Sequence, residues 1–244
     1  MNLIERHVTS STNEEIKTLI KEKELAEPTC LYTHHQFKGK GQKGNSWISE
    51  PYQNLTCSFF FNDLRIKVEN QFYLSIYVSL AITNTLEKNG LKNVHVKWPN
   101  DILARNGKKL CGILIENTLS TALISQSVIG IGLNINQKKF DNLPNATSVA
   151  LELGREINIR KVIENLIHEF ENFSKDEILN VNLKNYYDKL YRYGKNTTFI
   201  DAQKNIFKGR IEGITDSGLL QVRNLNDQKL KSYNFKAIKF LDQS

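Results

Sequence analysis

Apolar residues recur along this chain with two periods, and each period predicts one kind of element. Apolar runs predict strands over residues 55–61 and 122–133, whereas residues 71–88 carry apolar side chains at helical spacing. The apolar surface of that helix is wide, which is typical of a helix buried across a sheet. Helical spacing also predicts helices over residues 146–153, 160–173 and 183–190.

From residue 197 the pattern changes to short alternating runs, which are typical of a small antiparallel β domain. We therefore predict an α+β fold with two parts: a mixed or antiparallel sheet with helices packed on it in residues 1–194, and a small β domain in residues 195–244. The strands predicted in the second part are 198–200, 206–214, 219–222 and 237–240.

A helix start is predicted at Ser11, because Ser11 and Glu14 have the spacing of a capping box and Ile16, Leu19 and Ile20 supply an apolar face. The pattern alone favours a purely structural explanation, since hydroxyl and amide residues are good N-caps.

The run KWPNDIL, residues 97–103, places polar residues at the end of a predicted strand. Pro99 has no N–H and restricts the residue before it to extended geometry. We therefore expect Lys97 to end one strand, and Asn100 and Asp101 to begin the next.

The dipeptide Asn106-Gly107 predicts a hairpin, because both residues accept positive φ. Such a turn would bring Lys108 and Lys109 back toward Asp101. A carboxylate and a reachable ammonium would then lie together in one compact site.

Residues 38–44 contain three glycines and three lysines, and this predicts a flexible cationic loop that can lie over an anion. The loop does not match the P-loop pattern and does not open a Rossmann helix. A solvated surface loop remains an equally simple interpretation of the same residues.

Composition limits these interpretations without choosing among them. The chain has 244 residues and 40% hydrophobic content, with no stretch long enough to span a bilayer and no hydrophobic signal region, so we expect a cytoplasmic protein. The odd number of cysteines (Cys30, Cys57 and Cys111) favours reduced core residues over disulfides or a zinc site. The net charge of +7 is spread along the chain, which fits an acidic protein partner as well as nucleic acid.

The run KWPNDIL followed by GKKLCGILIE resembles the signature of the biotin protein ligases, and the resemblance extends over nearly the whole chain. It implies a class II synthetase-like catalytic domain and an SH3-like C-terminal barrel. It also implies ATP-dependent attachment of biotin, through biotinyl-5'-AMP, to a lysine of a biotin carboxyl carrier domain, with ATP and Mg²⁺ required. Only about ten residues precede Ser11, so we expect the monofunctional type without a helix-turn-helix.

The resemblance also implies which residues form the site. Lys109 and Asp101 are expected to be catalytic, and no protein ligand set for a metal is expected. The residues implied to bind biotin are Ser11, Thr12, Asn13, Gln36, Lys40, Gly41, Gln42, Lys109 and Gly112. Those implied to bind ATP or the adenylate are Lys40, Gln42, Trp47, Lys97, Asn100, Asp101, Lys109 and Asn134.

The chain departs from the family in the glycine-rich loop, where Lys40, Gln42 and Lys43 replace three arginines. Lysine is a single point charge and glutamine carries none, so the hypothesis is that this chain retains the adenylate less tightly.

Three alternatives stay open at this stage: a lipoate or octanoate ligase of the same fold, a basic nucleic-acid-binding module, and a structural interaction protein. The resemblance favours a carboxylase carrier domain as partner, with neither DNA nor a membrane. It allows a homodimer without requiring one.

Overall fold

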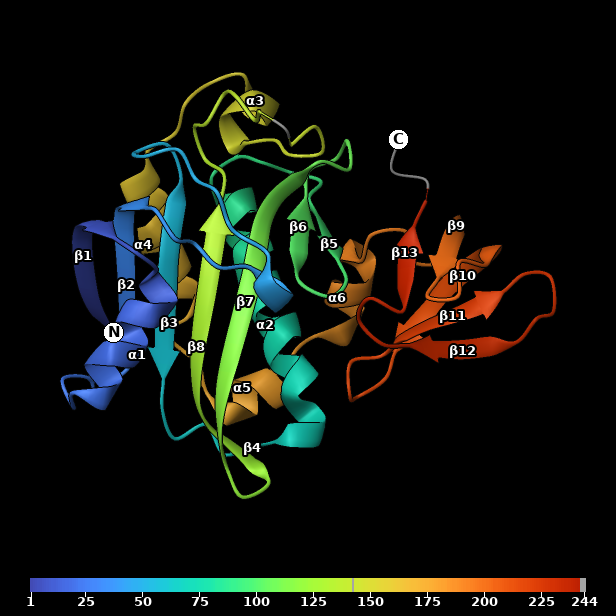
Figure 1. Cartoon of the computed structure of the whole chain (residues 1–244), viewed down its shortest axis with the longest axis horizontal. Coiled ribbons are helices and arrows are strands. Elements are labelled where there is room, and N and C mark those ends of the chain that lie inside the picture. The colour runs from blue at the N-terminus through green and yellow to red at the C-terminus, as the bar shows by residue number, and fades with distance from the viewer. Residues whose placement is uncertain (142, 242–244) are drawn as a thin grey trace.

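The computed structural model describes residues 1–141 and 143–241, without the side chain of Lys43. Figure 1 shows a large sheet backed by helices and, at the other end of the molecule, a smaller sheet formed by the C-terminal residues. The two parts follow one another in the chain, as the change of hydrophobic pattern predicts.

The large sheet is mixed, with the strand order β1-β2-β3-β8-β7-β6-β5 and β4 paired to β8. β1 runs parallel to β2, and the other pairs are antiparallel. Its strands are β1 (Asn2–Thr9), β2 (Thr29–Gln36), β3 (Leu55–Phe61), β4 (Ile66–Lys67), β5 (His95–Lys97), β6 (Asp101–Leu103), β7 (Lys109–Ser120) and β8 (Leu123–Leu133). The predicted fold class is confirmed.

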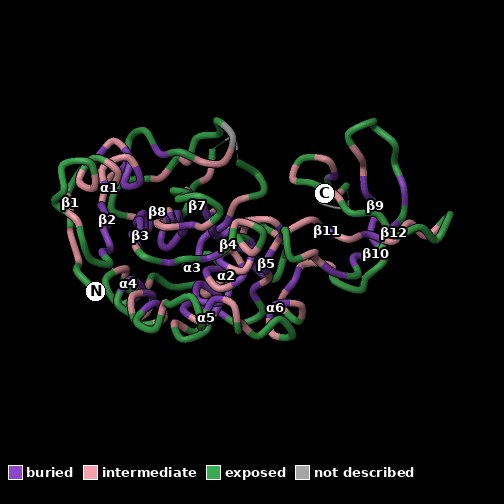
Figure 2. Tube along the Cα trace, turned by 90° about the horizontal axis from the view of Figure 1, so that it is seen from below, coloured by how far each residue is buried: buried purple, intermediate pink, exposed green. Residues whose placement is uncertain are grey.

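Helices cover the two faces of this sheet unequally. The long helix α2 packs on one face together with α4 and α5, whereas α1 contacts β2, β3 and β8 from the other (Figures 1 and 2). The helices are α1 (Thr12–Lys21), α2 (Gln71–Lys88), α3 (Val149–Leu153), α4 (Ile159–Glu169), α5 (Lys175–Leu179) and α6 (Leu183–Lys189). Within the described residues, none of them is long and apolar enough to cross a membrane.

Side chains along β3 alternate between the two faces of the sheet, so this strand contributes to the apolar layers on both faces. Phe59 and Phe61 point toward α2 and belong to the main core, where the Phe59 ring lies 4.6 Å from the ring of Phe170. Phe60 points to the opposite face and packs against Ile16 of α1. One strand thus contributes large apolar side chains to both layers, and all of its residues are buried.

The small sheet has the order β12-β11-β10-β9-β13, with every pair antiparallel. Burial alternates strictly along β10, which is the pattern of a sheet with one face in a core. The strands are β9 (Asn196–Asp201), β10 (Ile206–Ile214), β11 (Leu220–Asn224), β12 (Leu230–Tyr233) and β13 (Ile238–Phe240).

A turn of the small sheet is attached by hydrogen bonds to the part that contains the large sheet. Trp98 Nε1 donates to Gly218 O at 2.9 Å, and the Tyr73 hydroxyl donates to Asp216 Oδ1 at 3.1 Å. A Cβ on Gly218 would lie 2.6 Å from the Phe72 ring, and the φ of +88° also requires glycine at this position. Trp98 therefore helps to hold the small sheet against the rest of the protein.

The sequence predictions hold for most elements and are wrong for a few. The bounds of β3 and α2 agree with the prediction, and Gly154 ends α3 with a φ of 70°. The helix predicted over residues 146–153 begins only at Val149, because the preceding residues pair with Lys109: Lys109 N donates to Asn145 O at 2.7 Å, and Thr147 N donates to Lys109 O at 3.0 Å. The helix predicted over residues 160–173 ends at Glu169, and β1, β12 and α5 were not predicted.

Replacing Phe170 should test the main core. Phe170→Ala removes a ring that is 1% exposed, and large-to-small changes at such sites cost about 3–5 kcal/mol. The midpoint of urea unfolding should fall accordingly. Phe37→Ala is the matched control, because the Phe37 side chain is 56% exposed and its removal should change stability by less than about 0.5 kcal/mol. Equal losses in the two variants would contradict this description of the core.

Candidate functional site

Three glycines form a floor on the face of the large sheet that carries α1. Gly112 of β7 is paired with Gly132 of β8, and Gly130 lies two residues before Gly132 on the same face. A Cβ on Gly132 would lie 2.2 Å from Trp47 Cε2, and one on Gly130 would lie 2.4 Å from Asn13 Oδ1. Only glycine therefore allows Trp47 and Asn13 to lie directly on the sheet.

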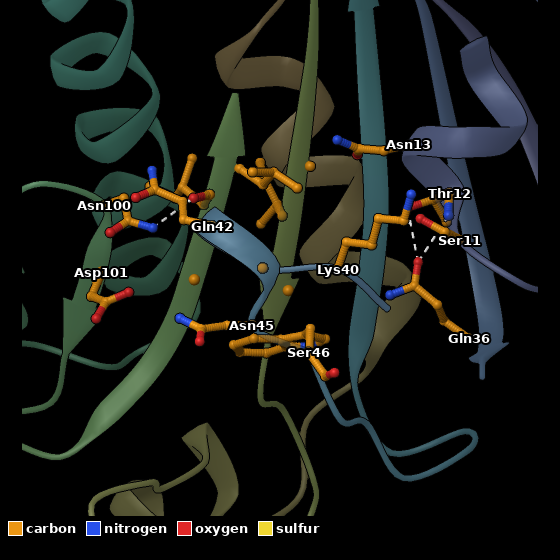
Figure 3. A pocket seen from close by; sticks show the side chains of 18 of the residues that line it. Ser11, Thr12, Asn13, Gln36, Lys40, Gln42, Asn45, Ser46, Asn100 and Asp101 are labelled. Carbon is orange, nitrogen blue, oxygen red and sulfur yellow. Dashed lines mark hydrogen bonds between the residues drawn. The ribbon is translucent and has the colours of Figure 1, made fainter. Parts of the chain in front are cut away.

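The first cavity, of about 220 Å³, lies over this glycine floor (Figure 3). The start of α1 closes one end of it, and the glycine-rich loop crosses above it. Twelve of the predicted residues line it: Ser11, Thr12, Asn13, Gln36, Lys40, Gly41, Gln42, Trp47, Asn100, Asp101, Lys109 and Gly112.

The second cavity, of about 400 Å³, lies on the other side of Trp47. It shares four lining residues with the first cavity, namely Ser46, Trp47, Asp101 and Lys109. Lys97 and Asn134 of the predicted set also line it. Its far wall is apolar and is formed by Phe140, Leu143, Pro144 and Ala146.

Lys109 and Asp101 lie where the two cavities meet. Lys109 Nζ is 2.7 Å from Asp101 Oδ1 and 5.5 Å from the centre of the Trp47 ring, so the ammonium is held by an ion pair and by a cation–π contact. The structure therefore places the predicted carboxylate and ammonium next to each other.

The turn that brings this pair together differs from the predicted one. Gly107 has a φ of 83°, but Asn106 does not have positive φ. Gly107 N donates to Ala104 O at 2.9 Å, so the turn is centred on Arg105 and Asn106, and glycine takes the left-handed position after it.

Lys97 adds a second cation at this point, and its side chain is partly buried. Burial lowers the pKa of Lys97, the charge of Lys109 lowers it further, and Asp101 opposes the change. The Lys97 ammonium also lies 5.6 Å from the centre of the Phe240 ring. An anion in the second cavity would favour the charged form of this lysine.

The start of α1 was predicted correctly, but its capping box was not. Ser11 is the N-cap residue, yet its side chain makes no capping hydrogen bond to the residues described. Gln36 Oε1 instead accepts from Thr12 N at 2.8 Å, as Figure 3 shows. Glu14 forms ion pairs with Lys17 at 2.9 Å and with Lys40 at 3.1 Å.

Two predicted residues use their side-chain amides to support the site. Asn100 Nδ2 donates to Ile113 O at 2.8 Å and so holds β7, whereas Asn134 Nδ2 donates to Thr147 O at 3.0 Å. Both side chains line a cavity, but the N–H groups that make these bonds face the protein. The sequence motifs therefore predicted that Asn100 and Asn134 belong to the site, but they did not predict the hydrogen bonds that these two side chains donate to the backbone.

Every residue implied to bind biotin or ATP lines at least one of the two cavities, while its role toward a ligand stays a prediction. The side chain of Lys43 lies outside the described residues. Sequence reasoning missed Asn45 and Ser46, which follow the glycines, and the apolar wall of the second cavity. The apolar residues between 140 and 146 are the signal that could have indicated that wall.

The three cysteines of the chain are buried, which disfavours the reactive thiolate form. Cys30, Cys57 and Cys111 are free and buried, as predicted, and burial raises the pKa of the Cys57 and Cys111 thiols well above the usual value. Across residues 1–141 and 143–241, no group of three His, Cys, Asp or Glu residues is arranged to hold a metal ion.

Gly132→Ala should expose Trp47, because the added methyl group overlaps the indole ring. Acrylamide should quench a larger share of the tryptophan fluorescence, since the other tryptophan, Trp98, is 5% exposed and stays buried. Gly213→Ala is the control, because the nearest atom there is the flexible end of Gln221. Unchanged quenching in Gly132→Ala would show that the floor does not determine the position of Trp47.

Comparison with known proteins agrees with this architecture. Residues 6–134 match the biotin/lipoate A/B protein ligase family, and residues 193–235 match the biotin protein ligase C terminal domain. The chain is 29% identical over 227 residues to the bifunctional ligase/repressor BirA of Bacillus spizizenii, covering 90% of this chain and 68% of the relative. It is 30% identical over 174 residues to the biotin–[acetyl-CoA-carboxylase] ligase of Mycobacterium tuberculosis, covering 67% of this chain and 60% of that protein.

A solved structure has the same fold. The biotin protein ligase from Aquifex aeolicus in complex with biotin and ATP superposes with a TM-score of 0.73 at 24% identity, covering 98% of each chain. This likeness concerns the fold, whereas the sequence match over residues 6–134 covers more than half of the chain. The chain belongs to the biotin/lipoate A/B protein ligase family.

Proposed function

We propose that this chain is a biotin protein ligase. In the first step a carboxylate oxygen of biotin attacks the α-phosphorus of ATP, pyrophosphate leaves, and biotinyl-5'-AMP forms. In the second step a lysine amine of a carrier domain attacks the acyl carbon, AMP leaves with the bonding electrons, and the amine loses a proton. Activation is needed because hydroxide is a poor leaving group from a carboxylic acid at neutral pH.

One observation carries this proposal: the two cavities meet at Lys109. An acyl-adenylate has an acyl half and a nucleotide half joined at a phosphate. The first cavity has the polar start of α1 at one end, the second has an apolar wall, and Lys109 lies between them. A cation at this junction is placed where negative charge builds on the carboxylate and the α-phosphate oxygens.

The polar end of the first cavity suits the ureido ring of biotin. Ser11, Thr12, Asn13 and Gln36 offer hydroxyl and amide groups there, and a ureido group both donates and accepts hydrogen bonds. Lipoate and octanoate lack such a group, so this end of the cavity favours biotin. Relatives in this family include the biotin–[acetyl-CoA-carboxylase] ligase already compared, which supports a carboxylase carrier domain as the acceptor.

The nucleotide would lie in the second cavity, between Trp47 and the apolar wall. Mg²⁺ bound with ATP would screen the charge of the triphosphate, and such a site would need few protein ligands. Among the residues that the structure describes, Asp101 is the carboxylate that lines both cavities, and it pairs with Lys109 there. We assign Asp101 two roles: holding Lys109, and assisting the loss of the amine proton in the second step.

The direct test is an ATP–pyrophosphate exchange assay with biotin, lipoate, octanoate and no acid. Exchange that depends on biotin is expected. Exchange with lipoate or octanoate but not with biotin would indicate a lipoate or octanoate ligase instead. The absence of exchange with every acid would contradict the proposed enzyme.

Lys109→Ala should slow biotin-dependent pyrophosphate release by about 100-fold or more, because the loss of one donor that stabilises charge in the transition state commonly costs about 3–4 kcal/mol. Biotin binding should weaken much less. Lys108→Ala is the matched control, since Lys108 is exposed and lies one residue away. A rate for Lys109→Ala within about tenfold of wild type would show that the assigned role is wrong.

Gln42→Arg should lengthen retention of biotinyl-5'-AMP on the enzyme. Gln42 lines the first cavity and carries no charge. A charge-assisted hydrogen bond is worth about 0.5–2 kcal/mol more than a neutral one, which could slow release by roughly tenfold. Dissociation of the preformed intermediate at low ionic strength measures the effect. Gln203→Arg adds the same charge at an exposed loop position and should leave release unchanged. Equal rates in all three proteins would make Gln42 a bystander.

A further inference from the structure

A line of hydrogen bonds connects Glu116 of β7 with the polar end of the first cavity. Glu116 Oε2 accepts from Asn13 Nδ2 at 2.7 Å. Ser58 Oγ lies 2.5 Å from Asn13 Oδ1 and 2.6 Å from Thr12 Oγ1. Gln36 Oε1 accepts from Thr12 N at 2.8 Å. Figure 3 shows Asn13, Thr12 and Gln36 side by side along this end of the cavity.

Glu116 determines the direction of the bonds nearest to it. Lys17 Nζ lies 2.6 Å from Glu116 Oε1, so the carboxylate is ion-paired and has no proton to donate. The edge of Asn13 that faces Glu116 must therefore be its NH₂ group. Asn13 Oδ1 must then face Ser58, and the Ser58 hydroxyl proton is used in that bond, because a carbonyl oxygen cannot donate.

The Ser58 hydroxyl has one proton and two acceptors within reach, Asn13 Oδ1 and Thr12 Oγ1. Because that proton is used in the bond to Asn13, the lone pairs of Thr12 Oγ1 stay available to a ligand. The Thr12 hydroxyl proton is itself donated to Gln36 Oε1 at 3.3 Å. Gln36 uses Oε1 on the Thr12 backbone, so its Nε2 remains a donor, and no acceptor for Nε2 is found among the residues that the structure describes.

We infer that Glu116 is a positioning residue that sets the donor and acceptor pattern of the first cavity through Asn13 and Ser58. The pattern places an acceptor, Thr12 Oγ1, beside a donor, Gln36 Nε2. A head group that carries N–H and C=O together is complementary to it. We identify this head group as the ureido ring of biotin on the basis of the proposed function. The directions of the hydrogen bonds follow from the structure alone.

Glu116→Gln tests the inference with little change in size. The new amide can present either its oxygen or its NH₂ to Asn13, so Asn13 can turn over and the bonds through Ser58 lose their fixed direction. We expect the KM for biotin to rise about tenfold, with kcat within about threefold of wild type, because the reacting carboxylate lies at the other end of the ligand. Pyrophosphate release at varied biotin concentration separates the two constants.

A charge-swapped pair provides the rescue. Asn13→Asp alone sets two carboxylates against each other and should raise the KM further than Glu116→Gln does. Adding Glu116→Gln to Asn13→Asp lets the new amide donate to the new carboxylate, whose other oxygen again accepts from Ser58. The double variant should therefore regain about tenfold or more in KM relative to Asn13→Asp. A double variant no better than Asn13→Asp would overturn the inference.

Lys17→Met is the matched control, because it removes the ammonium that pairs with Glu116 but leaves Glu116 able to accept from Asn13. Its KM for biotin should stay within about threefold of wild type. A loss equal to that of Glu116→Gln would mean that charge, and not hydrogen-bond direction, matters at this position. If the wild type turns over biotin and Glu116→Gln does so with an unchanged KM, the inference fails while the proposed function stands. A wild type that turns over no biotin contradicts the proposed function and the ligand named with it.

Discussion

The site depends on the absence of side chains at Gly112, Gly130 and Gly132. Side chains alternate between the two faces of a strand, so Ile131, which lies between two of these glycines, points into the main core while they leave the opposite face bare. Glycine inside a strand weakens the strand. The buried core on the other face offsets that cost, and the bare face becomes a surface on which Trp47 and a ligand can lie flat.

Two cations, Lys97 and Lys109, lie close together at the junction of the cavities, and Lys109 is paired with Asp101. Burial lowers the pKa of Lys97 because charge there is poorly solvated, and the nearby charge of Lys109 lowers it further. An anionic ligand would offset both the repulsion between the lysines and the loss of solvation. The same arrangement that makes this part of the site costly without a ligand would make it complementary to a phosphate group in the transition state.

Local patterns predicted the elements whose burial is regular, and non-local contacts explain the rest. α2 and β3 have wide apolar surfaces, so the hydrophobic period alone predicts their bounds. β1 is an edge strand that pairs with β2 and has half of its residues exposed, so its apolar pattern is weak. Residues 145–147 are held extended by Lys109, far away in sequence, which no local pattern can show. The family resemblance named the site residues, but only the structure shows that Asn100 uses its side-chain N–H to hold β7.

Lys40 is held in a way that leaves it available to a ligand. Its ammonium lies 3.1 Å from Glu14, but the two side chains are 55% and 41% exposed, and ion pairs this exposed contribute only about 0–1 kcal/mol. Lys40 can therefore exchange Glu14 for a ligand oxygen at small cost. Glu14 would keep Lys17, which also pairs with Glu116. The glycine-rich loop can thus change partners while the hydrogen bonds from Glu116 to the polar end of the first cavity stay in place.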